Sequence, residues 1–334
     1  MKVLSSIKKN TYLILIITIL VLYLVLKDDF EDIVEAFQNI NGFWLIIAIL
    51  FLFLSIGIKG LANYIVLDDK RLTIKEAIKH NVIVQFFNGV TPFCTGGQPM
   101  EIYMATEHKI PLSKATNRTI QSFIYYQIAL VLCGIIAVMY NFFHPLFPKI
   151  KILDNLVLIG FIINFVVAII FILISKYKKI TTLICNLTKK IAKKLKWNMT
   201  EEVIEEKFEE YYRGFQEIRN KKFRIFLAIF LNVLSLICLY LIPLFILESM
   251  QSPYRLTIIN TLTTSAYVYI MGAFIPIPGA SGGIEYGFTQ FFSNFIGVDK
   301  IAAVLLLWRS ITYYFPIIVG ALVFNLERKV KRWE

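Results

Sequence analysis

Two short stretches rich in glycine and proline interrupt otherwise apolar sequence, and they resemble each other. Residues 91–101 read TPFCTGGQPME, and residues 276–285 read PIPGASGGIE. Each has a proline, a Gly-Gly pair four residues later and a glutamate within four residues of that pair. A helix broken inside a bilayer leaves N–H and C=O groups that lipid cannot satisfy, so it must be buried in protein or line a wet cavity. A matched pair of such breaks in two halves of a chain indicates a transporter-like binding site.

The composition is that of a membrane protein. Hydrophobic residues make up 57% of the chain, and the mean hydropathy is +0.66, which is typical of a chain that crosses the bilayer several times. A helix needs about 20 apolar residues to cross about 30 Å of hydrocarbon. We therefore expect an all-α polytopic membrane protein with six full spans, at residues 11–26, 42–58, 120–140, 153–175, 225–247 and 301–324.

The formal charge of +12 is concentrated in a few segments, and the positive-inside rule converts this pattern into a topology. We expect both termini in the cytoplasm, and the acidic connection 27–41 outside. No small-residue cleavage site follows the N-terminal run, which predicts an uncleaved first span. The basic segments assigned to the cytoplasm are 1–10, 59–80, 109–118, 176–196, with eight lysines and no acid, and 328–332.

These sides decide how the two broken segments enter the membrane. Residues 81–107 lie between two cytoplasmic loops, so they must form a re-entrant hairpin that enters from the inside. Residues 257–297 must enter from the outside, because the last span has to end at the cytoplasmic C-terminus. Opposite entry predicts an inverted repeat, with halves at about 43–140 and 225–326. A full span at 257–275 would break this parity.

Further features accompany the hairpins. Between the halves, the charged segment 176–222 contains a run of glutamates with lysine and arginine at 201–222, which predicts a cytoplasmic amphipathic helix with i,i+4 ion pairs. Each hairpin is followed by an arginine and then a Tyr-Tyr pair: Arg118 with residues 125–126, and Arg309 with residues 313–314.

Arg309 is the strongest single candidate for binding a ligand. It lies about two turns into the last expected span, where an arginine costs at least about 2.5–3.5 kcal/mol on insertion scales. It would clamp a phosphate, since guanidinium matches phosphate oxygens, or form a structural ion pair with Glu285. Arg118 is a weaker candidate for the same role, because it lies near the cytoplasmic interface, where its side chain can reach water instead. Glu285 and Glu101 would pair the arginines, relay protons or contact a cationic headgroup, although Glu101 also fits an interfacial carboxylate near a helix start.

The turn residues supply the other candidates. Exposed N–H groups at the start of a half-helix form an anion site, glycine allows close backbone approach, and proline ends helices. Tyr126 and Tyr313 fit helix packing as well as ligand contact. Gln98 would satisfy freed backbone groups or bind a headgroup. The turn positions expected to bind are Pro92, Gly96, Gly97, Pro278, Gly279, Gly282 and Gly283.

Several other functions find no support in the sequence. The four cysteines have no CxxC spacing and the three histidines lie far apart, so we expect neither a disulfide framework nor a metal site. No nucleotide-binding loop, GxSxG or HExxH motif is present. We expect no cofactor and no nucleic-acid partner, and we interpret the positive charge as topology and contact with anionic lipid.

The motifs resemble the lysylphosphatidylglycerol synthase transmembrane-region family, the flippase-like part of the multiple peptide resistance factors, which also has short stand-alone members. The resemblance rests on TPFCTGGQPMEIY at 91–103, SFIYYQ at 122–127, IPIPGASGGIEYGF at 275–288 and LWRSITYY at 307–314. It implies an integral protein of the cytoplasmic (inner) membrane that moves a phosphate-bearing lipid, a phospholipid or a polyprenyl-phosphate lipid, between leaflets. The family is linked to antibiotic resistance.

Two alternatives stay open beside this interpretation. Full-length resistance factors add a soluble domain that transfers lysine from lysyl-tRNA to phosphatidylglycerol, so the chain would be a phosphatidylglycerol lysyltransferase if it shared that activity. Because it ends at Glu334, soon after the last expected span, we expect that chemistry to be missing. The chain would otherwise be a non-transporting anchor for a separate lipid-modifying synthase, held through the lysine-rich segment 176–222.

Overall fold

The structure is a computed structural model that describes residues 40–147, 151–194, 200–219, 221–251, 253–272, 275 and 277–330. The described residues fold into helices joined by short turns, without a strand, which confirms the all-α expectation. The first half contains α3 (Gly42–Leu67), α4 (Ile74–Gly89), η2 (Pro92–Cys94), α5 (Gly97–Glu107), α6 (Leu112–Phe143) and α7 (Lys151–Lys176). Then follow α8 (Lys178–Lys194), α9 (Glu201–Arg219), α10 (Lys222–Tyr240), α11 (Ile242–Ser249), α12 (Ile258–Gly272), η3 (Pro278–Ala280), α13 (Gly283–Phe292), α14 (Val298–Arg309), η4 (Ser310–Tyr314) and α15 (Phe315–Val330).

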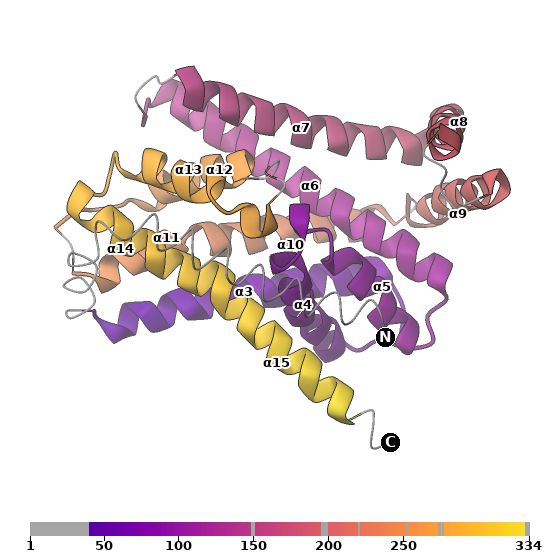
Figure 1. Cartoon of the computed structure of the whole chain (residues 1–334), viewed down its shortest axis with the longest axis horizontal. Coiled ribbons are helices and arrows are strands. Elements are labelled where there is room, and N and C mark those ends of the chain that lie inside the picture. Colours follow the sequence, from indigo (N-terminus) through magenta and orange to yellow (C-terminus); the bar gives the residue numbers. More distant parts are fainter. Residues whose placement is uncertain are drawn as a thin grey trace.

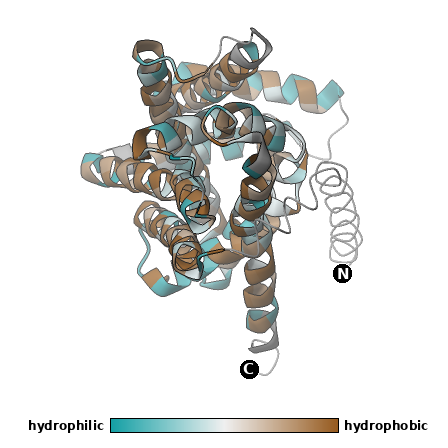
Figure 2. Cartoon of the chain, turned by 90° about the vertical axis from the view of Figure 1, so that its left-hand side faces the viewer, coloured by the Kyte–Doolittle hydropathy of each residue, from teal (hydrophilic) through white to brown (hydrophobic). Residues whose placement is uncertain are grey.

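Five helical segments of the described chain are long and apolar enough to cross a membrane. They correspond to five of the six predicted spans, and the sixth, at 11–26, lies outside the described residues. Large apolar side chains on these helices face outward, such as Leu158 and Ile162 of α7, which are 55% and 49% exposed. Such surfaces suit lipid rather than water, and Figure 2 shows the apolar colour running along the long helices. The segments are Gly42–Leu67, Leu112–Phe143, Asn155–Ile174, Lys222–Ser249 and Lys300–Glu327.

The predicted cytoplasmic loop at 59–80 is much shorter than expected. α3 continues to Leu67 and stops where Asp68 takes a left-handed conformation, with φ of 50°. α4 starts directly after Thr73, whose side chain forms a reciprocal capping box with Glu76. Only residues 68–73 connect the two helices, so the first hairpin starts at Ile74 rather than at residue 81, and Lys59 lies inside a helix.

Two helix–turn–helix hairpins occupy the middle of the bundle. The arms α4, α5, α12 and α13 have 16, 11, 15 and 10 residues, or about 15–24 Å at 1.5 Å per residue, which is less than the hydrocarbon thickness. In Figure 1, α5 lies toward the end of the bundle that carries α8 and α9, whereas α13 lies toward the opposite end. The turns η2 and η3 contact each other between them.

The two turns share their backbone geometry over the first three residues and differ at the two that follow, where Gly96 has φ of −73° and Gly282 has φ of 86°. Phe93 and Cys94 have φ of 52° and 53°, and the corresponding Gly279 and Ala280 have φ of 63° and 52°. Thr95 N–H donates to the Pro92 carbonyl over 3.2 Å, and Ser281 N–H donates to the Pro278 carbonyl over 3.4 Å. The similarity of the two sequence motifs therefore extends to a repeated turn in three dimensions.

The helices around the hairpins pack crosswise. α4 packs on α15 of the other half, and α12 packs on α6. The first helices of the halves, α3 and α10, meet at two serines that exchange hydrogen bonds. Ser55 Oγ donates to the Ser235 carbonyl over 2.9 Å, and Ser235 Oγ donates to the Ser55 carbonyl over 2.9 Å. Each serine thus makes the same hydrogen bond to the other. Reciprocal contacts of this kind arise where two similar elements are related by a two-fold axis.

One end of the bundle gathers the basic loops that the charge pattern assigned to a common side. Lys79 at the start of the first hairpin pairs with Glu327 near the C-terminus over 3.0 Å. Lys114 at the start of α6 pairs with Asp69 over 2.8 Å. Asp68 pairs with Lys221 and Arg224, where α10 begins. These ion pairs bring the basic segments together at one end of the bundle.

The charged segment 176–222 contains two helices, and the second of them, α9, corresponds to the amphipathic helix expected at 201–222. α8 and α9 pack on each other, and their charges meet mainly between the helices. Lys178 lies 3.1 Å from Glu209, and Lys189 lies 2.6 Å from Glu205. The predicted i,i+4 pairing is represented by Arg213 and Glu209, at 3.9 Å. The glutamates of α9 therefore neutralise part of the lysine-rich α8.

Candidate functional site

Arg309 stands at the junction of α14 with η4, a π-helical turn that interrupts the last span. Its Nε lies 2.7 Å from Glu285 Oε1, and both side chains are buried. Its Nη2 donates to the Gly279 carbonyl over 3.0 Å and to Ser281 Oγ over 3.3 Å. The predicted ion pair with Glu285 is therefore present, and the guanidinium also binds the turn of the second hairpin.

Glu285 connects this ion pair to the start of α13. Its Oε2 accepts the Gly282 N–H over 2.6 Å, so one carboxylate holds both Arg309 and the first turn of the half-helix. Gly282 has φ of 86°, a conformation that favours glycine. Gly283 packs so closely on Ile275 that a Cβ there would overlap its side chain. The glycine pair thus allows the sharp entry into α13, beginning from Pro278 in η3.

Tyr313 joins both hairpins to the last span. Its hydroxyl donates to the Gly89 carbonyl at the end of α4 over 2.9 Å. Its ring lies 4.4 Å from the Arg309 guanidinium carbon and fills the space beside Gly279, where a Cβ would overlap it. Of the two readings predicted for Tyr313, the observed contacts are those of packing within the protein.

The first hairpin caps its half-helix without a glutamate. Gly96 N–H donates to Thr91 Oγ1 over 2.8 Å, and Gly97 N–H donates to Asn88 Oδ1 over 2.9 Å. Glu285 is the third residue of α13, and the third residue of α5 is Pro99. Glu101 is therefore not the positional counterpart of Glu285. Gln98 carries a buried Oε1 that accepts no hydrogen bond in the structure, while Pro92 is exposed at the start of η2.

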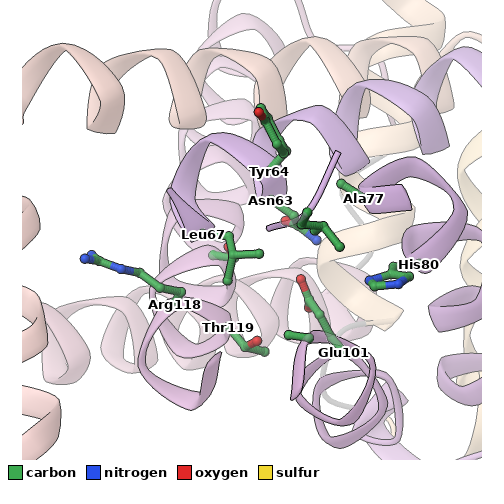
Figure 3. Close-up of a pocket in the computed structure, with 11 residues that line it drawn as sticks. Asn63, Tyr64, Leu67, Ala77, His80, Glu101, Arg118 and Thr119 are labelled. Carbon is green, nitrogen blue, oxygen red and sulfur yellow. The ribbon is translucent and has the colours of Figure 1, made fainter. Parts of the chain in front are cut away.

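Glu101 faces α3 instead of an arginine. Figure 3 shows its side chain directed toward Asn63, and the two residues interact by a side-chain hydrogen bond. Both line a pocket that encloses about 370 Å³, part of it open to the outside. His80 and Thr119 line the same pocket, from α4 and α6.

Lys59 is the cation that sequence reasoning missed at this site. Its Nζ lies 4.0 Å from the centre of the Tyr126 ring, and its charge acts on Glu101 and on Cys94 in η2. Lys59, Glu101 and Tyr126 keep some exposed surface although they lie inside the bundle. The apolar residues at 61–67, which follow Lys59 without a proline, were the available signal that the helix continues past it.

Arg118 belongs to another part of the molecule. It donates to Gln121 Oε1 over 2.9 Å and to Glu217 Oε2 of α9 over 3.2 Å. Although its residue lines the pocket of Glu101, its guanidinium points away from that carboxylate in Figure 3. Arg309 precedes Tyr313 by four residues, and the residue four before Tyr125 is Gln121. The predicted parallel between the two arginines is therefore not found in the structure.

Comparison with known proteins identifies the family that the sequence motifs resemble, and the match covers nearly the whole chain. Residues 12–320 match the family described as the lysylphosphatidylglycerol synthase TM region. An uncharacterized protein of Mycoplasma genitalium is 24% identical, over 92% of this chain and 84% of its own length. A UPF0104 membrane protein of Methanocaldococcus jannaschii is 24% identical, over 97% of this chain and 96% of its own. A UPF0104 membrane protein of Archaeoglobus fulgidus is also 24% identical, over 87% and 85%. The chain belongs to the lysylphosphatidylglycerol synthase transmembrane-region family.

Proposed function

We propose that the chain moves a phosphate-bearing lipid, a phospholipid or a polyprenyl-phosphate lipid, between the two leaflets of the cell membrane. One observation carries this proposal: two hairpins too short to cross the bilayer meet at their turns, inside a bundle of apolar spans. Irregular backbone at membrane depth is tolerated where protein or a polar cavity surrounds it. Paired half-helices of this kind form substrate sites in transporters.

The polar groups near the turns suit a lipid headgroup. Lys59 and Tyr126 face the first hairpin and keep exposed surface, so an anionic phosphate would bind Lys59 while its acyl chains stay in lipid. Glu101 offsets the lysine charge when no ligand is bound. An ammonium on the headgroup would interact with this carboxylate. Lys59 is therefore the first cation that we expect a phosphate to meet.

Arg309 has a different place in this proposal. Its Nε and Nη2 already bind Glu285, Gly279 and Ser281, so a phosphate that bound on this side of the guanidinium would replace at least one of these contacts. Such a replacement would loosen the turn of the second hairpin. We propose that Arg309 mainly fixes the turn, and that a lipid phosphate reaching it would release η3 during transport.

The matched turns and crosswise packing support an inverted repeat. Two halves with equivalent hairpins in opposite orientation can exchange conformations, which opens a shared site first to one side and then to the other. We propose that the end carrying α8, α9 and residue 330 faces the cytoplasm, because the basic loops gather there. The hairpins then enter from opposite faces, as re-entrant elements.

A leaflet-selective assay in proteoliposomes tests this function. Fluorescent phospholipids and polyprenyl-phosphate lipids are placed in one leaflet, and their arrival in the other is followed by chemical quenching. We expect the purified chain to accelerate at least one phosphate-bearing lipid over protein-free vesicles. No acceleration of any of them would contradict the proposal.

The family's name includes a synthase, so the same purified protein should also be assayed for synthase activity. The purified chain is incubated with lysyl-tRNA and phosphatidylglycerol, and the lipids are analysed by mass spectrometry. Lysylphosphatidylglycerol formed by the chain alone would favour a lysyltransferase. Lipid movement without product would support the transporter.

A further inference from the structure

Helix α8 presents two different faces. One packs on α9, with Cys185 and Ala192 buried against Ile204 and Phe208. Thr181 is buried on the same side of the helix. This face is covered by α9 and, at Thr181, by the end of α7.

The opposite side of α8 carries an apolar stripe. Leu183, Leu187 and Ile191 are four residues apart, so they lie on one face of the helix. They are 61%, 50% and 50% exposed. Single exposed leucines are common on protein surfaces, but three in register along a helix form a continuous strip of apolar surface.

Lysines border this stripe. α8 contains six lysines and no acidic residue. Lys178 and Lys189 pair with glutamates of α9. Lys179, Lys190 and Lys194 are exposed and lie three or four residues from a member of the stripe. A helix with apolar residues on one side and lysines at its border is the pattern of helices that lie in the headgroup layer of a membrane.

The position of α8 fits the same layer. α8 begins at Lys178, directly after the candidate span Asn155–Ile174. Thr181 Oγ1 donates to the Ile174 carbonyl over 2.6 Å, which fixes the corner between the two helices. Figure 1 shows α8 end-on at the end of α7, so the two axes cross. A helix that crosses the end of a span lies along the membrane surface.

α9 holds α8 in this orientation. Asn117 Nδ2 of α6 donates to the Glu210 carbonyl over 2.6 Å, and Gln121 Nε2 donates to the Gly214 carbonyl over 3.1 Å. The Arg118–Glu217 pair adds a third contact between α6 and α9. Because α9 is attached to a spanning helix and covers one face of α8, the orientation of α8 is fixed. Ile180 and Ile184 pack on the bundle near the corner with α7, whereas the stripe residues stay exposed.

We propose that α8 is an interfacial helix that docks on anionic phospholipid headgroups through the Leu183–Leu187–Ile191 stripe and the lysines beside it. The charge of this face favours an anionic lipid surface as its partner. The lysines beside the stripe complement such a surface, whereas the glutamates that pair with α8 lie on the α9 side. The docked helix fixes the end of α7 at the depth of the headgroups. This surface is separate from the hairpin turns and does not depend on lipid transport.

The full chain in lipid nanodiscs tests this docking. A fluorophore is attached at Leu187→Cys in a chain whose four native cysteines are replaced by alanine, and a matched fluorophore is attached at Glu206→Cys on the exposed side of α9. We expect brominated phospholipids to quench the fluorophore at position 187 and not the one at 206. Quenching at 187 should be stronger in discs with phosphatidylglycerol than in discs of phosphatidylcholine alone.

Two triple variants separate specific docking from net charge. K179Q/K190Q/K194Q removes lysines beside the stripe and should abolish the extra quenching in anionic discs. K178Q/K189Q/K207Q removes the same number of charges, including the two lysines paired with α9, and should retain most of it. Hydrogen exchange of the unmodified chain gives an independent readout, with greater protection of α8 in anionic discs.

Equal quenching at positions 187 and 206, without dependence on lipid charge, would overturn the proposal. No quenching at position 187 would overturn it as well, because the stripe would then lie outside the headgroup layer. Equal loss of quenching in both triple variants would also contradict it, because docking would then follow total charge rather than the lysines beside the stripe.

Discussion

The Arg309 guanidinium and the Glu285 carboxylate meet over 2.7 Å with both side chains buried, and the same carboxylate accepts the Gly282 N–H. One ion pair therefore connects the last span to the turn and the first residues of the second half-helix. A buried pair of this kind adds little over an apolar pair, but the loss of one partner strands the other charge. The structural role of the pair can therefore be tested by removing one partner at a time and then both.

Glu285→Gln should destabilise the protein strongly. Glutamine keeps an acceptor for Gly282 but leaves Arg309 without its counter-charge, which costs about 3–5 kcal/mol for a buried pair. Thermal unfolding in detergent measures the loss. The double variant with Arg309→Gln should lose less than the sum of the two single variants. As a control, Glu248→Gln removes the partner of Arg255, which is 73% exposed, and should cost at most about 1 kcal/mol. Equal effects of Glu285→Gln and Glu248→Gln would contradict the structural role of the buried pair.

The second turn predicts opposite effects for two neighbouring substitutions. Gly279→Ala introduces a Cβ that overlaps the Tyr313 ring, at a φ of 63°. It should lower the unfolding temperature and slow lipid movement. Ala280→Gly, at a φ of 52°, relieves a conformation that costs a non-glycine residue about 1 kcal/mol. It should be neutral or mildly stabilising. Melting temperatures of the two variants decide the matter, and a milder effect for Gly279→Ala than for Ala280→Gly would be inconsistent with the geometry.

Tyr313→Phe isolates the bond between the last span and the first hairpin. The substitution keeps the ring but removes the hydroxyl that binds the Gly89 carbonyl, and a hydrogen bond of this kind contributes about 1 kcal/mol. We expect a modest fall in stability and faster hydrogen exchange at the end of α4. Tyr314→Phe removes the hydroxyl of the adjacent tyrosine and serves as the control. Unchanged exchange at residues 86–90 in Tyr313→Phe would show that this bond does not hold the hairpin.

Asp68 predicts a pH-dependent stability at the end with the basic loops. Burial raises its pKa, but hydrogen bonds and charge from Arg224 and Lys221 outweigh burial and lower the pKa from 3.8 to about 2. Because the folded-state pKa is below the unfolded one, the stabilisation is complete above the unfolded value and is lost as the pH falls toward 2. Asp68→Asn, which tolerates the left-handed φ, should be less stable than the wild type at pH 7, and the difference should vanish near pH 2. Unfolding curves across this range check the prediction, and a constant difference would refute it.

The sequence predicted the parts of the fold that depend on local chemistry. Proline and glycine at 92–97 and 278–283 marked the two turns, because few other residues permit such breaks. The charges of the loops predicted which segments share an end of the bundle, and the Lys79–Glu327 and Lys114–Asp69 pairs join such segments. Residue type alone was sufficient for both inferences.

Features that depend on spacing or on distant partners were harder to predict. Lys59 was assigned to a loop because it ends an apolar run, whereas the helix continues to Leu67 and turns the lysine toward Tyr126. Arg118 resembled Arg309 in its neighbours, but it lies three residues farther from its Tyr-Tyr pair, and its guanidinium pairs with Glu217 of α9. The choice between ligand and ion pair for Arg309 depended on how its side chain meets Glu285 and the η3 turn, which no local pattern specifies.

The most direct test of the account is the rate at which a fluorescent phosphate-bearing lipid crosses between leaflets in proteoliposomes with wild-type or Lys59→Gln protein. Lys59 is the cation beside the first hairpin, and a hydrogen bond to a charged group is worth about 1.5–3 kcal/mol. We expect the wild type to accelerate crossing and Lys59→Gln to slow it by roughly tenfold or more. Lys70→Gln, at an exposed loop position, should keep the wild-type rate. Wild-type protein that leaves every such lipid at the rate of empty vesicles, or equal rates for Lys59→Gln and the wild type, would contradict a headgroup path between the hairpins.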